Sequence, residues 1–247
     1  MRKPIMTQHL TLTQYFKSVA AVAPSNRPRG EAPFVTISRE AGAGGHALAE
    51  ALAARLAKQD GELFSGWQIF DRSLCERVAA DPELHVSLES LLNEEFHTGL
   101  DDYLRSVLAD HSSQSKIDHR MFRTVRSICS LGRAIVIGRA SALVTRDLPL
   151  GVHVRLVSQR RARIQRIRRE NGVDAVAARR ILDQQDARRA RKVEIYFKKN
   201  IADPLLYDCV WNADTVSCGA MAESLVYLIR QRVSQRLRPT TGPLKRT

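Results

Sequence analysis

Three of the four residues from Gly42 to Gly45 ("GAGG") are glycines, and they separate an apolar run from a helix-forming run. Glycine allows backbone angles at which successive N–H groups converge, and a helix N-terminus attracts negative charge, so such a loop suits phosphate oxygens. A Walker A loop adds a lysine and then a serine or threonine, but Gly45 and His46 occupy those positions here. The glycines alone are equally typical of a tight turn between a strand and a helix.

Arginine is the second residue type that could do chemistry. Arg139 directly follows the apolar run 134–138, where open α/β sheets place ligand-binding residues, although a surface salt bridge is the alternative. Asp186 and Arg189 are three residues apart and therefore share one face of a helix. Planar guanidinium groups bind phosphate oxygens in pairs, but most arginines in a dense run are solvated or paired with carboxylates. The run around Asp186 contains Arg160, Arg161, Arg163, Arg166, Arg168, Arg169, Arg179, Arg180, Arg188 and Arg191.

The elements that must position these residues follow from the hydrophobic pattern. Leu48, Leu52 and Leu56 form one helical stripe, residues 72–130 read as helices and loops, and an arginine-rich helical run covers 158–199. A last amphipathic helix ends near residue 237. Strands alternating with helices predict an α/β fold, with a mainly parallel sheet flanked by helices. The expected strands are the short apolar runs 34–37, 67–71, 134–138, 151–157 and 206–213.

Composition limits the function classes. The 247 residues carry 39 Lys and Arg against 26 Asp and Glu, and the resulting net charge of +13 favours an anionic partner. The four cysteines and seven histidines lack the spacings of zinc sites or disulfide frameworks, so we expect no protein-ligated metal. No apolar run approaches the roughly 20 residues needed to span a bilayer. We therefore expect a cytoplasmic protein without a membrane partner.

The order of several motifs resembles the cytidylate kinase-like family, a divergent branch of the P-loop nucleoside monophosphate kinases. The stretch "VTISREAGAGGHALAEALA" (35–53) is similar to the opening of that family, whose members commonly have glycine at the position of Gly45. The resemblance spans roughly residues 34–235, and the order of the motifs is more specific than any one of them. The later motifs are "IFDRSL" (69–74), "AIVIGRASA" (134–142), "VHVRLVSQRRARIQRI" (152–167), "DARRARKVEIYF" (186–197) and "DPLLYDCVWNAD" (203–214).

This resemblance implies a P-loop NTPase-type three-layer sandwich with an arginine-rich helical lid. The kinase-like domain would cover residues 33–237, with an acceptor-binding helical segment at 72–130 and the lid at 158–199. Residues 1–32 are consistent with a flexible N-terminal extension, and residues 238–247 with a basic tail. The oligomeric state is not predicted.

The resemblance also implies an activity, the transfer of the ATP γ-phosphoryl group to CMP, dCMP or a related monophosphate. Mg²⁺ would be held mainly through the nucleotide, because no Ser or Thr follows the glycines. Arg39, Arg139 and Arg189 would supply catalytic charge. The acceptor would bind to Asp71, Arg139, Asp186 and Arg189, although Asp71 is equally explained as a capping carboxylate. The donor would bind to Gly42, Ala43, Gly44, Gly45, His46, Ala47, Arg160 and Arg163, and His46 departs from the arginine common in the family.

Two alternatives come from other function classes. Because the Walker lysine is absent, the first is a catalytically weak protein that binds a nucleotide as a sensor or interaction module. The second is a nucleic-acid-binding protein, since a basic helical face neutralises phosphates. The run "RRARIQRIRRE" lacks interleaved aromatic residues for base stacking, which disfavours nucleic acid as a partner.

Overall fold

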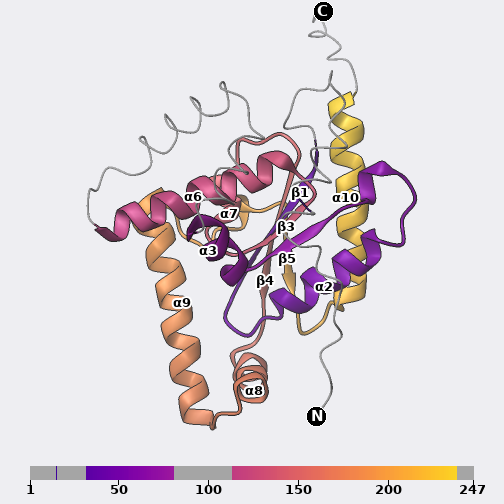
Figure 1. Ribbon diagram of the computed structural model, residues 1–247. Helices are drawn as coiled ribbons and strands as arrows, with labels where there is room; N and C mark the ends of the chain where they lie inside the picture. The colour runs from indigo at the N-terminus through magenta and orange to yellow at the C-terminus, as the bar shows by residue number, and fades with distance from the viewer. Residues whose placement is uncertain (1–14, 16–31, 81–112, 238–247) are drawn as a thin grey trace, which may run out of the picture.

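The computed structural model describes residues 15, 32–80 and 113–237, and its strands form one sheet (Figure 1). All paired strands are parallel, in the order β2-β3-β1-β4-β5. The strands are β1 (Phe34–Arg39), β2 (Gln68–Phe70), β3 (Ala134–Ile137), β4 (Gly151–Val157) and β5 (Cys209–Asn212). Each predicted apolar run contains or overlaps one of them, which confirms the predicted α/β fold. The strand that leads into the glycine loop, β1, lies at the centre of the sheet.

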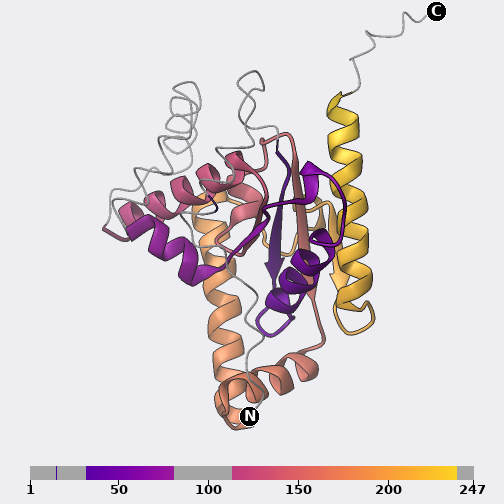
Figure 2. The same cartoon turned by 45° about the vertical axis from the view of Figure 1, so that its right-hand side comes forward.

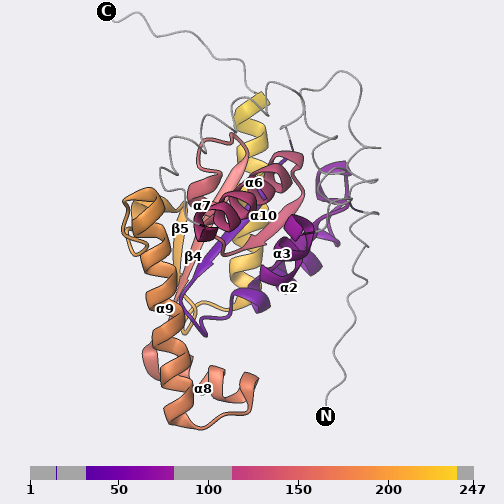
Figure 3. The same ribbon diagram turned by 60° about the vertical axis from the view of Figure 1, so that its left-hand side comes forward.

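Helices cover both faces of this sheet (Figures 2 and 3). Helices α2 and α10 pack together on one face, and α3 and α6 pack on the other. No helix in the described ranges is long and apolar enough to cross a membrane. The helices are α2 (Gly45–Leu56), α3 (Arg72–Ala80), α6 (Ser113–Leu131), α7 (Ser141–Val144), α8 (Arg160–Asn171), α9 (Ala175–Phe197) and α10 (Cys218–Leu237), with 3-10 turns at Glu62–Phe64 and Pro204–Leu206.

The arginine-rich run 158–199 forms two helices, α8 and α9, with a short break between them. Gly172 ends α8 with a φ of 64°, a left-handed conformation that glycine adopts without strain. Asp174 then caps α9, because its carboxylate accepts the backbone N–H of Ala177 at 2.7 Å.

Part of the predicted organisation concerns residues that the structure does not describe. The middle of the predicted acceptor-binding segment, residues 81–112, lies outside the described residues. Most of the predicted N-terminal extension and the whole basic tail, residues 1–14, 16–31 and 238–247, also lie outside them.

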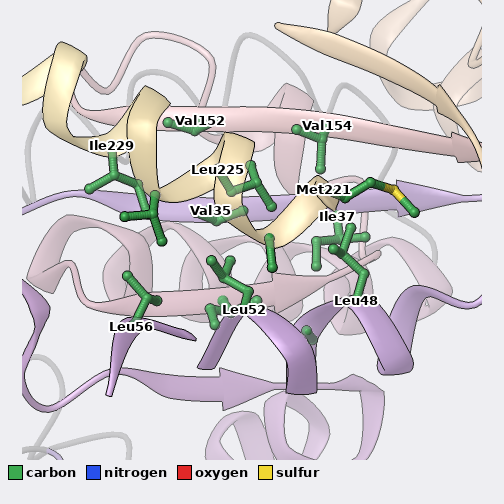
Figure 4. Close-up of a cluster of buried hydrophobic side chains, with 14 of the residues drawn as sticks. Val35, Ile37, Leu48, Leu52, Leu56, Val152, Val154, Met221, Leu225 and Ile229 are labelled. Atoms are coloured by element: carbon green, nitrogen blue, oxygen red, sulfur yellow. The ribbon is translucent and has the colours of Figure 1, made fainter. Parts of the chain in front are cut away.

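The face of the sheet under α2 and α10 carries an apolar cluster that packs against β1 (Figure 4). Val35 and Ile37 of β1 are fully buried there, in register with Val152 and Val154 of β4. Phe34 of the same strand is buried in the cluster on the opposite face. Because both faces of β1 are packed, the residues at its carboxyl end are held in a fixed place. The helical partners in this cluster are Leu48, Leu52, Leu56, Met221, Leu225 and Ile229.

Tyr15 is fully buried in the cluster on the opposite face. Its ring lies edge-on to Phe70, with the ring centroids 5.1 Å apart, and its hydroxyl donates to the carbonyl of Gly132 at 2.6 Å. At least this residue of the sequence before residue 32 therefore belongs to the core.

Tyr15→Phe is expected to lower the free energy of unfolding by about 1–2 kcal/mol, because the Gly132 carbonyl loses a buried donor while the ring remains. Urea unfolding would measure the change. Tyr227→Phe is the matched control, since Tyr227 is 65% exposed on α10, and its unfolding free energy should not move. Equal effects of the two substitutions would contradict the importance of the Tyr15 hydrogen bond.

His153 on β4 is a buried histidine that the fold keeps neutral. Its side chain lies 2.8 Å from the hydroxyl of Thr36, measured at Nδ1, and its backbone N–H donates to Asp208 at 2.7 Å. Burial lowers the pKa of His153 to about 4, although the Asp208 carboxylate acts in the opposite direction.

This depressed pKa predicts acid sensitivity. The unfolded chain protonates at His153 near pH 6.5, whereas the folded chain does so only near pH 4, so stability is present above pH 6.5 and falls as the pH drops towards 4. The expected loss is about 3 kcal/mol from this group by pH 4. Urea unfolding between pH 7 and pH 4 would measure it, and His153→Gln should flatten that part of the profile. An unchanged profile in the variant would assign the acid sensitivity to other groups.

Candidate active site at the carboxyl edge of the sheet

Ser38 and Glu40, which flank Arg39, tie the end of β1 to neighbouring elements. The Ser38 hydroxyl accepts a hydrogen bond from Arg155 of β4 at 3.1 Å. The Glu40 carboxylate accepts the backbone N–H of Ser158 at 3.0 Å and lies 3.4 Å from Nε of Arg163. These contacts hold the backbone at the end of β1. The side chain of Arg39, between the two flanking residues, extends towards the glycine loop.

The glycine loop leads directly into α2, as its sequence predicts. Gly42 and Gly44 have φ values of 73° and 87°, which residues other than glycine rarely adopt. Within the described residues, the backbone N–H groups of Gly44, Gly45, His46 and Ala47 have no hydrogen-bond partner. These groups belong to the first turn of a 12-residue helix, where they are available to an anion.

Arg39 passes between two glycines that leave room for its side chain. A Cβ atom added at Gly45 would lie 3.2 Å from Cγ and Cδ of Arg39, and one added at Gly138 would lie 1.9 Å from its Nη1. The Arg39 side chain therefore lies against the backbone of Gly45, where the side chain of a Walker lysine would begin. Arg39 can adopt this position because residue 45 has no side chain.

The turn after β3 is unusual because three successive residues are left-handed. The φ values are 78° at Gly138, 60° at Arg139 and 55° at Ala140. Such angles cost about 1–2 kcal/mol for each residue with a side chain. Strain of this kind gathers at ligand sites, because the surrounding structure must hold it in place. Here it places Arg139 at the carboxyl edge of the sheet.

A cavity of about 420 Å³ lies between the ends of β1 and β3 and the helix α9. No carboxylate lines it, so its walls carry a large excess of positive charge. One part of the wall is apolar or aromatic, with Ala140, Ala142, Leu143, Val193, Ile201 and Tyr207. Its six cationic side chains are Arg39, Arg72, Arg139, Arg188, Arg189 and Lys192.

The cations of this cavity repel one another. Burial lowers the pKa of Arg39 to about 9, and the charges of Arg189 and Arg139 act in the same direction. Burial and neighbouring cations likewise lower the pKa of Arg139 and of Arg189. Carboxylates outside the lining offset part of this charge, since Arg139 lies 3.2 Å from Glu76 and Lys192 lies 2.5 Å from Asp118. An anion in the cavity would relieve the remaining repulsion.

The structure brings together most of the predicted site residues. The loop from Gly42 to Ala47, the cavity residues Arg39 and Arg139, and Arg189 on α9 lie around the same edge of the sheet. His46 lines the cavity beside the loop. Arg189 also donates to the backbone carbonyl of Arg39 at 3.3 Å, which joins α9 to the end of β1.

Four other predicted residues do not line the cavity. Asp71 caps α3, since its carboxylate accepts the backbone N–H of Leu74 at 2.8 Å. Arg160 forms an exposed ion pair with Asp183 at 2.6 Å. Arg163 and Asp186 pair with each other at 2.5 Å beside the glycine loop. The roles predicted for these four residues in donor or acceptor binding stay predictions.

Among the cationic and aromatic residues that line the cavity, sequence reasoning missed four, namely Arg72, Arg188, Lys192 and Tyr207. A signal for two of them was present. Gln185, Arg188, Arg189 and Lys192 follow the spacing of one helical stripe, and all four line the cavity from α9. The other two come from different elements, and no spacing in the sequence connects them.

Comparisons with known proteins show what this chain is similar to. The chain resembles a solved structure of an uncharacterized protein from Eubacterium ventriosum, with a TM-score of 0.58 and 18% identity over 81% of this chain and 99% of that one. A shikimate kinase from Bacteroides thetaiotaomicron matches with a TM-score of 0.38 and 13% identity, over 83% of this chain and 95% of that one. No similar sequence was found among curated proteins. The sequence model of the cytidylate kinase-like family matches residues 34–215, a span that contains the glycine loop, the Gly-Arg turn and α9. The protein therefore belongs to the cytidylate kinase-like family.

Proposed function

We propose that this protein is a phosphotransferase that moves the γ-phosphoryl group of ATP to a nucleoside monophosphate, with CMP or dCMP as the acceptor that the family favours. One observation carries the proposal: a cavity with six cations and no lining carboxylate adjoins a glycine loop in which the N–H groups of Gly44, Gly45 and His46 are unpaired within the described residues. Two phosphate-bearing ligands at adjacent positions are what a kinase of this kind must hold.

The residues divide between the two ligands by their positions. The N–H groups of Gly44, Gly45 and His46 would bind the donor phosphates, and Arg139 at the end of β3 would bind the acceptor phosphate. Arg39 lies between the loop and the Arg139 turn, where charge would develop on the transferred group. Phosphoryl transfer depends mainly on positioning and on such preorganised positive charge, so these residues suffice for the main catalytic demand.

The residues also fit a Mg²⁺ ion carried in by the nucleotide. The cavity lining offers the hydroxyls of Ser38, Ser141 and Tyr207 but no carboxylate. In the described residues, no group of three or more His, Cys, Asp or Glu side chains could hold a metal ion. When bound with ATP, Mg²⁺ would neutralise phosphate charge, and its ligands would be nucleotide oxygens and water.

A second candidate function is nucleotide binding without efficient turnover. It is favoured by Gly45 and His46, which stand where a Walker A loop carries its lysine and its Mg²⁺-binding hydroxyl. In that case the cavity would sense a nucleotide rather than convert it.

A coupled assay with ATP·Mg²⁺ and a panel of nucleoside monophosphates separates the two candidates. Turnover of CMP or dCMP above the other acceptors supports the proposal. Absence of turnover with every acceptor, together with measurable ATP binding, would establish the second candidate instead. Thermal unfolding adds an independent measurement, because a ligand at 100 times its Kd stabilises the folded state by about 2.7 kcal/mol.

A further inference from the structure

The carboxylate of Asp186 is engaged on both of its oxygens by groups beside the glycine loop. Oδ1 accepts the backbone N–H of Ala41 at 2.7 Å, and it lies 3.4 Å from Nη1 of Arg189. Oδ2 accepts a charge-assisted hydrogen bond from Arg163 at 2.5 Å. Ala41, the residue that directly precedes the first loop glycine, is 1% exposed. Asp186 therefore contacts the entrance of the donor loop and does not line the cavity.

Arg163 on α8 connects this carboxylate to the rest of the loop. The residue is 8% exposed, and its Nε donates to the carbonyl of Ser158 at 3.0 Å. The backbone of α8 also approaches the loop directly, since a Cβ atom added at Gly42 would lie 2.8 Å from the carbonyl oxygen of Arg163. Arg166, one turn of helix further on, donates to the carbonyl of Gly42. Helix α8 thus packs on the outer side of the loop.

Helix α9 has two stripes of residues, one that packs on the glycine loop and one that lines the cavity. Ala178 and Leu182 are buried against Ala41 together with Ile167 of α8, and Asp186 continues their four-residue spacing. The second stripe, which faces the cavity, contains Gln185, Arg188, Arg189 and Lys192. Asp186 thus belongs to the stripe that packs on the loop.

We propose that Asp186 is a positioning residue for the donor-phosphate loop, which it holds through the N–H of Ala41 and through Arg163. The resemblance to cytidylate kinases implied a different role, contact with the acceptor nucleotide. In this arrangement α8 and α9 clamp the loop, and the pair of Arg163 and Asp186 fixes its entrance. A loop that lacks the Walker lysine depends on its backbone N–H groups for donor binding, so its shape determines donor affinity. The part of this inference that concerns donor affinity rests on the function proposed above.

The test compares Asp186→Asn and Asp186→Ala with the same two substitutions at Asp183. Asp183 lies one turn away on α9 and pairs with Arg160 of α8 in an exposed position, but it makes no contact with the loop. Calorimetry of the full-length protein would measure binding of ATP·Mg²⁺ and of CMP separately. Hydrogen exchange at the Ala41 amide would report the loop in the absence of any nucleotide.

The Asp186 variants are expected to raise the Kd for ATP at least tenfold and to leave the Kd for CMP within twofold. Asp186→Ala, which removes the acceptor, is also expected to lose protection at the Ala41 amide. The Asp183 variants are expected to change none of these. A raised Kd for CMP with an unchanged Kd for ATP would overturn the inference and return Asp186 to the acceptor. Unchanged protection at Ala41 in Asp186→Ala would also overturn it, as would equal effects of the Asp183 variants.

The two proposals fail in different ways. If the wild-type protein binds neither ATP nor CMP, the proposed function fails, and exchange at Ala41 still decides whether Asp186 holds the loop. If Asp186→Ala does not fold, Asp186→Asn retains an oxygen that can accept the Ala41 N–H but loses the charge that pairs with Arg163. That variant should still show weaker ATP binding than Asp183→Asn, and equal ATP binding by the two would overturn the inference.

Discussion

Arg39→Met is expected to lower kcat for phosphoryl transfer by roughly 10²–10³-fold, the usual effect of removing one preorganised charged donor from an active site. Arg39 is the cavity cation that also contacts Gly45 at the start of α2, so no neighbouring arginine can take its place without moving. The coupled assay with ATP and the preferred monophosphate measures the effect.

Stability provides a second readout for Arg39→Met. Burial and the charges of Arg189 and Arg139 oppose the protonated form of Arg39, so its removal relieves repulsion and should not lower the free energy of unfolding. A large loss of activity with retained stability therefore identifies a functional role. The control is Arg191→Met, which removes the same charge from an exposed position on α9 outside the cavity and should retain full activity. Comparable activity of the two variants would contradict the catalytic role of Arg39.

Gly45→Lys, which restores the usual Walker residue, is expected to lower activity by about 10²-fold rather than raise it. A Cβ atom at residue 45 would press on Cγ and Cδ of Arg39, which lie 3.2 Å away, and the nearby backbone of Gly138 prevents retreat on the other side. The guanidinium would then leave its place between the loop and the turn after β3. The same assay measures the loss.

The double variant Arg39→Met, Gly45→Lys isolates this steric cause. If the lysine acts by displacing Arg39, adding it to a protein that already lacks Arg39 causes little further loss, and the two effects are strongly non-additive. Full activity of Gly45→Lys alone would show that Arg39 and residue 45 are independent.

The sheet and its glycine loop were predictable because their signals are local. Each strand is a short apolar run, and "GAGG" follows the first of them without a gap, so pattern and turn chemistry agree. The order of the motifs along the chain indicates the family without any knowledge of tertiary contacts. The break between α8 and α9 carries ordinary helix-end signals, Gly172 and Asp174, although residues 158–199 were interpreted as one helical run.

The contacts of the arginines, in contrast, could not be predicted from local sequence signals. Arg160 and Arg163 are three residues apart on α8, and both were predicted to close over the donor. In the structure Arg160 is exposed and paired with Asp183, whereas Arg163 is buried against the loop. Helical spacing predicts that two residues share a face of a helix, but the orientation of the docked helix decides what each of them touches.

The sequence by itself determined the fold class, the glycine loop, the Gly-Arg turn and the family, because each depends on neighbouring residues or on their order along the chain. Only the tertiary structure decided that Arg39 fills the space beside Gly45, that Arg72 and Lys192 join the cavity, and that Asp186 reaches the loop. These contacts join segments up to about 150 residues apart, and they depend on how the helices pack against the carboxyl edge of the sheet.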